Sequence, residues 1–390
     1  FTGSRKILYC LYSQDTKNSI EKGGSAGFFP RRNGPAAGVM AFLFSARALS
    51  KAFGAQELFS NINLVVRPGD RAGLIGPNGS GKSTLLKIIC GFEDEDSGDI
   101  LMQKNMLTGY LAQDDVFDEH LSPVDNILST LEKAPLDEAE KMNRVQTLLS
   151  KAEFSDIESP VSSLSGGWRK RLSVCRALAA EPDLLVMDEP TNHLDIEGII
   201  WLEKLLDGTF SSSTSAFIVV SHDRRFLETC TNRIIELSRV YPDGSFQVDG
   251  NYSKFLEKRQ EFVELQNQQE ERLANKVRRE TEWLRRGPKA RTSKARYRIE
   301  EAYRLQEELG EVKGRNRSGG TVSIDFSATG RKTKKLLEAK GLEKSYGEKT
   351  LFSGLDILLS PGTKLGLLGS NGCGKSPLMT ILASAQTGSP

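Results

Sequence analysis

The fold of this chain is decided by the stretch Gly76-Pro77-Asn78-Gly79-Ser80-Gly81-Lys82-Ser83-Thr84. It fills the pattern G-x-x-x-x-G-K-S/T between an apolar run at 71–75, expected to be a short buried strand, and one at 85–89, expected to begin a helix. The glycines let the backbone turn so that successive N–H groups point at phosphate oxygens. Lys82 is then placed to reach the β- and γ-phosphates of a nucleotide, and Ser83 to hold Mg²⁺. The stretch predicts a phosphate-binding loop, and its two flanks argue against a chance glycine-rich turn.

Five further motifs follow the loop. They are Gln113 after a strand-like run at 108–112, the signature Leu164-Ser165-Gly166-Gly167-Trp168, the apolar run and carboxylates of 184–190, Thr191–Asp195, and Ser221-His222-Asp223. In order and spacing, the six motifs over residues 41–240 resemble the ATP-binding cassette superfamily. The resemblance implies an α/β fold, the P-loop NTPase cassette of ABC ATPases with its helical subdomain.

The resemblance also implies a site for ATP and Mg²⁺. Asp188 would hold Mg²⁺ through water, Glu189 would polarise the attacking water, and His222 would sense the γ-phosphate. Gln113 matches the residue that touches Mg²⁺ and the attacking water. Phe53 matches the aromatic residue under adenine, although an ordinary half-buried strand phenylalanine is the alternative. An isolated Asp-Glu pair is often a solvated turn, but its place between the signature and Thr191–Asp195 favours catalytic carboxylates.

The signature residues Ser165, Gly166 and Gly167 open a helix expected over 168–180. Their amides and the positive helix end point outward at an anion. In the family that anion is the γ-phosphate bound by the opposite cassette, so one cassette alone is incomplete. Trp168 replaces the Gln usual in transporters and resembles the ABC-F group, particularly its Uup branch.

Composition narrows the class of protein. A chain of 390 residues is long enough for two or more domains, and its net charge is only +2. The five cysteines are odd in number and scattered, and with three separated histidines they predict neither disulfides nor a zinc site. No apolar run approaches the roughly 20 residues that span a bilayer. We therefore expect a soluble, cytoplasmic protein without a membrane span.

The first 250 residues divide into an extension and a cassette. Residues 1–40 carry no readable element and are expected to be unstructured or non-native. The first cassette is expected over 41–250, with a helical subdomain at about 114–180. It closes with a hairpin whose turn is supplied by Tyr241-Pro-Asp-Gly244.

Residues 251–313 form a basic helical linker in this interpretation. From Arg272 to Arg298 there are eleven basic and two acidic residues, a local charge of +9, with Trp283 and Tyr297 interleaved. The sequence Trp283-Leu-Arg-Arg-Gly-Pro288 breaks the segment and predicts a helical hairpin. A solvated coiled coil that spaces two domains is one interpretation; a polyanion-binding element is the other, favoured by the charge asymmetry. The ABC-F resemblance implies ribosomes, and hence RNA, or branched DNA as the partner.

A repeat follows a flexible loop expected at 314–332. Tyr346 corresponds to Phe53, and a second phosphate loop runs from Gly369 to Pro377, so 333–390 is expected to begin a second cassette. The sequence stops at Pro390, so we expect that cassette to be truncated, with a second cassette in cis or a homodimer in trans completing the site. The nucleotide-binding residues expected in this part are Tyr346, Gly369, Asn371, Gly372, Gly374, Lys375 and Ser376.

The main prediction is a soluble ABC-F type ATPase that couples ATP binding and hydrolysis to action on ribosomes or structured nucleic acid. The alternative is the ATP-binding subunit of a membrane transporter, which the tandem plan, the basic linker and Trp168 oppose. A third interpretation is a polyanion-binding module with little turnover.

Overall fold

The structure, a computed structural model, describes residues 42–114, 116–132, 134–210, 215–285, 293–318, 336–346, 349–369 and 372–387. The extension expected at 1–40, the linker turn at 286–292 and the greater part of the loop expected at 314–332 lie outside these residues.

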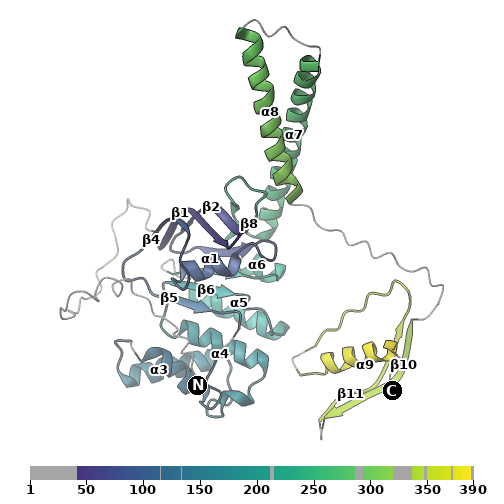
Figure 1. The fold of residues 1–390 in the computed structure, drawn as a ribbon. Coiled ribbons are helices and arrows are strands. Elements are labelled where there is room, and N and C mark those ends of the chain that lie inside the picture. Colours follow the sequence, from purple (N-terminus) through teal and green to yellow (C-terminus); the bar gives the residue numbers. More distant parts are fainter. Residues whose placement is uncertain are drawn as a thin grey trace.

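A six-stranded sheet carries the phosphate loop (Figure 1). Its order is β5-β6-β7-β3-β8-β9, parallel except for the last strand, which runs antiparallel to β8. The neighbouring inner strands β6 and β7 are buried at every position and apolar at every position except Asp188, as expected for strands covered on both faces. The bounds are β3 (Arg71–Ile75), β5 (Thr108–Leu111), β6 (Leu184–Asp188), β7 (Ala216–Val220), β8 (Arg233–Leu237) and β9 (Ser245–Asp249).

A smaller antiparallel sheet has the order β2-β1-β4, with β1 (Phe44–Phe53), β2 (Gln56–Val66) and β4 (Ser97–Met102). The first two strands follow the apolar runs of the sequence. Strand β4 was not predicted from the sequence, because Ser97-Gly-Asp-Ile-Leu-Met102 does not alternate polar and apolar residues. At Gly98 the backbone lies so close to β1 that an added Cβ would be 2.7 Å from the Arg47 carbonyl oxygen. Contact with β1 therefore creates this strand, and only glycine fits at that point.

Helices cover both faces of the large sheet. Those of the sheet layers are α1 (Lys82–Ile89), α5 (Ile196–Phe210) and α6 (Arg224–Cys230); the helical subdomain holds α2 (Pro123–Leu128), the short η2 (Ser129–Leu131), α3 (Glu138–Lys151), η3 (Val161–Ser163) and α4 (Gly166–Leu178). The helix predicted over 168–180 is α4, which begins earlier, at Gly166, and ends earlier, at Leu178. Its start is set by Ser165, whose extended ψ of 162° makes it the N-cap and puts both glycines inside the helix.

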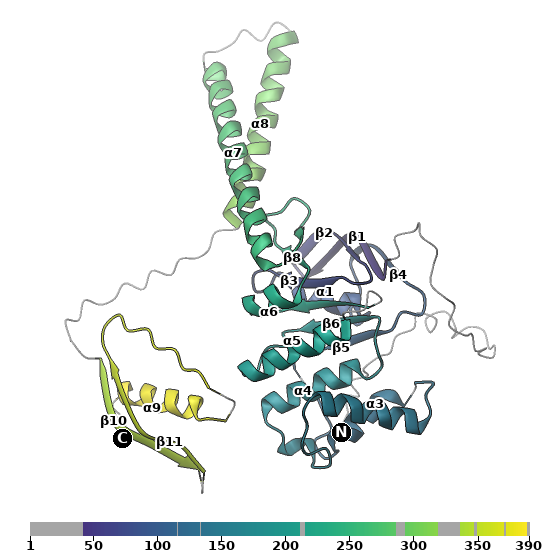
Figure 2. The ribbon, with the colours of Figure 1, turned by 180° about the vertical axis from the view of Figure 1, so that it is seen from behind.

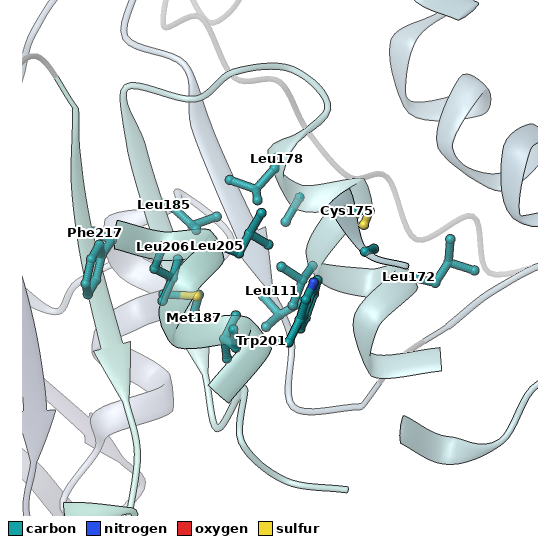
Figure 3. Packing of buried hydrophobic residues seen from close by; sticks show 14 of the residues in the cluster. Leu111, Leu172, Cys175, Leu178, Leu185, Met187, Trp201, Leu205, Leu206 and Phe217 are labelled. Carbon is teal, nitrogen blue, oxygen red and sulfur yellow. The ribbon is translucent and has the colours of Figure 1, made fainter. Parts of the chain in front are cut away.

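Alternate residues of the same strands supply two separate cores. Leu185, Met187 and Phe217 pack with α4 and α5 on one face (Figure 3). Leu184, Val186 and Ile218 face the opposite way, toward α1 and the small sheet. The phosphate loop, which joins β3 to α1, is therefore held by two packed layers.

The basic linker is a helical hairpin, α7 (Tyr252–Arg285) and α8 (Ser293–Ser318), which projects from the cassette in both views (Figures 1 and 2). Its apolar contacts are Leu273 on α7 against Leu305, Leu309 and Val312 on α8. The expected loop start at Gly314 is wrong, since α8 continues to Ser318. Contacts between the two helices extend past Gly314, because Asn316 Nδ2 donates to Glu270 Oε2 at 2.5 Å. This bond offsets the small loss of helix stability that a glycine causes.

The base of α7 is fixed to the large sheet. Glu236 of β8, which is 7% exposed, accepts from the Tyr241 hydroxyl at 2.5 Å and lies 2.9 Å from Arg259 Nε of α7. Phe262 of α7 packs on Phe246 of β9 with ring centroids 5.1 Å apart. Because Glu236 pairs in register with Ile75, the arm is attached to the strand neighbouring the phosphate loop.

The repeat near the end of the chain forms β10 (Leu337–Tyr346), β11 (Lys349–Leu359) and α9 (Lys375–Thr387). The run 364–368, which corresponds to β3, forms no strand, and Leu368 is 85% exposed. In the first cassette β3 lies between β7 and β8, whereas no described residue supplies such neighbours here. A strand of this kind needs partners on both sides for its backbone groups.

Within the described ranges, no helix combines the length and apolar character that crossing a bilayer requires.

Candidate nucleotide site

The phosphate loop is shaped by three glycines with positive φ, namely Gly76 (150°), Gly79 (78°) and Gly81 (88°). A Cβ at Gly76 would lie 2.5 Å from the Leu237 carbonyl oxygen, and one at Gly81 would lie 2.6 Å from the Phe59 ring. Gly76 and Gly81 are therefore required both for their dihedral angles and for space, and Gly79 for its dihedral angle. The loop ends at the N-terminus of α1, where unpaired N–H groups face outward.

The side chain of Lys82 folds back onto the phosphate loop and binds its main chain. Its Nζ donates to the carbonyl oxygens of Gly76 at 3.0 Å and Pro77 at 3.1 Å. Burial lowers the pKa of Lys82, and the charges of Glu189 and Asp188 act in the opposite direction. The ammonium group is therefore held where the sequence motif expects it, at the mouth of the cradle.

A cavity of about 510 Å³ lies against this loop. Besides Leu58 and Val220, its wall contains residues from separate parts of the sequence: Phe53, Asn78, Gly79, Gly81, Lys82, Ser83, Thr84, Gln113, Asp188, Glu189, Asn192 and His222. Gly76, Pro77 and Ser80 shape the loop without lining this cavity. Leu58, Asn192 and Val220 were not predicted from the sequence; Asn192 lies within Thr191–Asp195 and could have been found from that motif.

Two carboxylates end β6 at the cavity. Asp188 is 2% exposed and Glu189 is 8% exposed. Asp188 Oδ1 and Glu189 Oε2 have no hydrogen-bond partner among the residues that the structure describes. Glu189 has a φ of 51°, and its Oε1 lies 3.2 Å from His222 Nε2. A non-glycine residue at positive φ is strained, and such strain is concentrated at functional sites.

The pKa of Glu189 is raised, because its burial disfavours the charged form and Asp188 adds to the effect, while His222 and Lys82 oppose it. A buried carboxylate oxygen with no protein partner and a raised pKa is suited to accept a proton from water. The arrangement can therefore act as a general base beside a phosphate cradle.

Ser83, Gln113 and Asp188 line the same cavity and are all oxygen donors. Among the described residues, no cluster of three or more His, Cys, Asp or Glu could hold a metal ion unaided. This set fits Mg²⁺, which is usually bound by few protein oxygens together with water and substrate phosphates. The unpartnered Asp188 Oδ1 supports that fit.

Phe53 lies at the end of β1 with 54% of its surface exposed. The ammonium group of Lys51 is 5.5 Å from the ring centroid. An exposed flat ring at the rim of the cavity is suited to stack on a nucleotide base.

The structure does not bring the signature to this cavity. Ser165 and Gly166 are exposed at the N-terminus of α4, and neither they nor Gly167 line the cavity. Trp168 packs edge-on against Phe154, with centroids 5.0 Å apart. The signature amides are thus free to meet a nucleotide bound elsewhere.

At its described residues, the second phosphate loop has the same backbone conformation as the first. Gly369, Gly372 and Gly374 have φ of 158°, 78° and 99°, and Lys375 Nζ donates to the Gly369 carbonyl at 2.5 Å. Ser376 follows in the first turn of α9. Asn371 and the side chain of Tyr346 lie outside the described residues.

Pro377 occupies the place of Thr84 in this loop, in the first turn of α9. A helix tolerates proline there, but the N–H that would donate to phosphate is lost. In a chain with a complete second cassette and Lys82→Ala blocking the first loop, Pro377→Thr should strengthen ATP binding. One charge-assisted hydrogen bond is worth roughly 1.5–3 kcal/mol, or about ten- to a hundredfold in Kd. Titration calorimetry checks this; Lys375→Ala should remove the gain, and an unchanged Kd would contradict the role given to this N–H.

Comparison with known proteins agrees with this geometry. Two family models, each described as ABC transporter, match residues 59–192 and 246–318. A Bacillus subtilis protein named uncharacterized ABC transporter ATP-binding protein YfmR is 37% identical over 382 residues, 88% of this chain and 58% of its own length. The energy-dependent translational throttle protein EttA of Mycobacterium tuberculosis is 30% identical over 382 residues, 89% of this chain and 66% of its own. A solved dimeric bacterial ABC transporter cassette is 23% identical, with a TM-score of 0.47 over 53% of this chain and 98% of that one. The chain spans less than two thirds of the length of both relatives.

Proposed function

We propose that this chain, which carries an ATP-binding cassette of the ABC transporter family, is an ABC-F type ATPase of the Uup-like kind that acts in the cytoplasm on ribosomes or structured nucleic acid. The observation that carries the proposal is a basic helical arm fixed to the sheet that holds the phosphate loop. A relative that aligns over 89% of this chain is named for an energy-dependent effect on translation.

Hydrolysis would use the cavity residues in distinct roles. Lys82 and the amides at the start of α1 would hold the phosphates, and Ser83, Gln113 and Asp188 would hold Mg²⁺, which neutralises phosphate charge. Glu189 would take a proton from the attacking water through Oε2. His222, 3.2 Å from Glu189 Oε1, would keep that carboxylate in place and contact the γ-phosphate.

The arm presents its basic residues in a row. Arg272, Lys276 and Arg279 are exposed, and their spacing of four and three residues puts them on one flank of α7, with Trp283 one turn further on. Leu273, by contrast, faces α8. A row of exposed cations suits a phosphate backbone, which supports nucleic acid over a plain spacer.

Replacing Arg272, Lys276 and Arg279 together by Gln should weaken nucleic-acid binding and flatten its salt dependence. Three lost phosphate contacts lower the slope of log K against log salt by roughly 2–3. Fluorescence anisotropy with a structured RNA and, separately, a four-way DNA junction gives this slope. Sedimentation with ribosomes, with and without ATP, tells the two kinds of target apart.

The matched control replaces Lys87, Lys104 and Lys204, three exposed lysines outside the arm, by Gln. It removes the same charge and should leave the slope near that of the parent. Equal slopes for the two triple variants would mean that binding follows net charge and that the arm is only a spacer.

A further inference from the structure

Three basic residues of α4 hold the segment that follows β5. Arg169 makes two bonds of 2.7 Å to Glu119, and Arg176 Nη1 donates to the Val116 carbonyl at 2.8 Å. Between them, Lys170 Nζ donates to the carbonyl oxygens of Ala112 at 3.0 Å and Gln113 at 3.3 Å. The segment 112–119 is therefore tied to the signature helix at three points.

Lys170 stands out because its side chain is completely buried, with 0% exposed. Burying an ammonium group is costly unless strong acceptors replace its water. Two acceptors for its ammonium group are the main-chain carbonyls immediately after Leu111, where β5 ends and the sheet no longer supplies hydrogen-bond partners. Lysine provides three donors at the end of a long stem, which two neighbouring carbonyls can share.

The consequence falls on Gln113. Its carbonyl points to α4, while its exposed side chain lines the cavity with Asp188. Since the backbone is held from the α4 side, the Gln113 side chain leaves the main chain toward the cavity that Ser83 and Asp188 also line. Without Lys170 this short connection would have more conformations available, and the side chain would spend less time in the cavity.

We propose that Lys170 is a positioning residue, which acts through the backbone of Gln113 to place its amide at the Mg²⁺ side of the nucleotide site. The inference rests on the role of Gln113 in the proposed function. It also gives α4 two tasks: its first turn offers the signature to a nucleotide bound by another cassette, while its second turn sets Gln113 of its own site. Lys170 thereby joins two half-sites through one helix.

The test compares Lys170→Met with Lys141→Met. Lys141 is a comparably buried lysine of the helical subdomain, 8% exposed, whose ammonium pairs with Glu138 at 2.8 Å and not with the 112–119 segment. Calorimetry with a non-hydrolysable ATP analogue gives Kd in Mg²⁺ and in EDTA, and the Kd in EDTA divided by the Kd in Mg²⁺ is the ratio that reports the metal's contribution. Lys170→Met should reduce this ratio about tenfold, the usual effect of losing a group that orients a metal ligand. Its Kd in EDTA and the ratio for Lys141→Met should stay near the parent values.

A double-mutant cycle with Gln113→Ala shows whether Lys170 acts through that residue. Gln113→Ala alone should reduce the ratio, and adding Lys170→Met should reduce it no further. Lys170→Arg, which keeps the charged donors, should retain most of the ratio. Thermal unfolding is followed throughout, and Lys170→Gln replaces the Met variant if that variant does not fold.

Three results would overturn the proposal: a Lys170→Met ratio like that of Lys141→Met, effects that multiply in the double variant, or an equal loss of affinity in EDTA. If Gln113→Ala leaves the ratio unchanged, the metal role of Gln113 is wrong and the positioning role of Lys170 fails with it. Binding in EDTA would still decide separately whether the cavity takes ATP at all.

Discussion

Glu189→Gln should lower ATP turnover by at least about a hundredfold while leaving ATP affinity within a small factor of the parent. The change removes the only proton acceptor assigned to the attacking water and keeps the size of the side chain. Lys82, Ser83 and the loop amides, which would hold the phosphates, are untouched. Steady-state hydrolysis and equilibrium ATP binding check the two halves of this prediction, and the variant should accumulate a closed, target-bound state.

Thermal unfolding is the control for this variant, and we do not expect the substitution to lower the Tm, as most substitutions of buried residues do. Burial raises the pKa of Glu189 in the folded protein, so the carboxylate destabilises the fold at pH values above that raised pKa. Gln carries no charge, so this penalty is absent from the variant, and its Tm above the raised pKa should not fall below that of the parent. As pH falls through the raised pKa, Glu189 takes up a proton and the difference should disappear. Turnover within a few-fold of the parent would contradict the role of Glu189, and a lower Tm would mean that the loss came from damaged folding.

Mixing Glu189→Gln chains with Ser165→Arg chains should restore ATPase activity from two inactive parents. A protein of these 390 residues holds one signature and one pair of carboxylates after an apolar strand. In the structure Ser165 and Gly166 of the signature are exposed, and no signature residue lines the cavity of its own cassette. Two first cassettes placed head to tail would each lend the signature to the other. In the mixed dimer one site then carries both lesions and the other carries neither.

In an equal mixture, about half of the dimers are mixed, and each has one intact site. The parent's specific activity should rise with protein concentration below the Kd of the dimer. Analytical ultracentrifugation with ATP, run on the same samples, gives that Kd. Each variant mixed with itself serves as the control and should stay inactive. Activity that does not depend on concentration, or that does not return on mixing, would point to a monomeric or contaminating ATPase.

The sequence by itself determined the features that neighbouring residues encode. The phosphate loop was predicted because glycines at fixed spacing allow the positive φ now found at Gly76, Gly79 and Gly81. The apolar run ahead of the two carboxylates, recognised in the sequence, forms the buried strand β6. The hairpin of the arm followed from a Gly-Pro break between long helical segments. The ABC cassette fold expected from these motifs is confirmed.

The tertiary structure decided what depends on contacts between distant residues. Strand β4 exists through its pairing with β1, whereas 364–368, equally apolar in sequence, forms no strand because no described neighbour pairs with it. The pKa of Glu189 is raised by burial that no local pattern encodes. Lys170 reads in the sequence as one more basic residue of a charged helix, and its contact with Gln113 arises only when α4 packs beside the end of β5. Local patterns specify dihedral angles and apolar faces, but burial and long-range hydrogen bonds are properties of the packed chain.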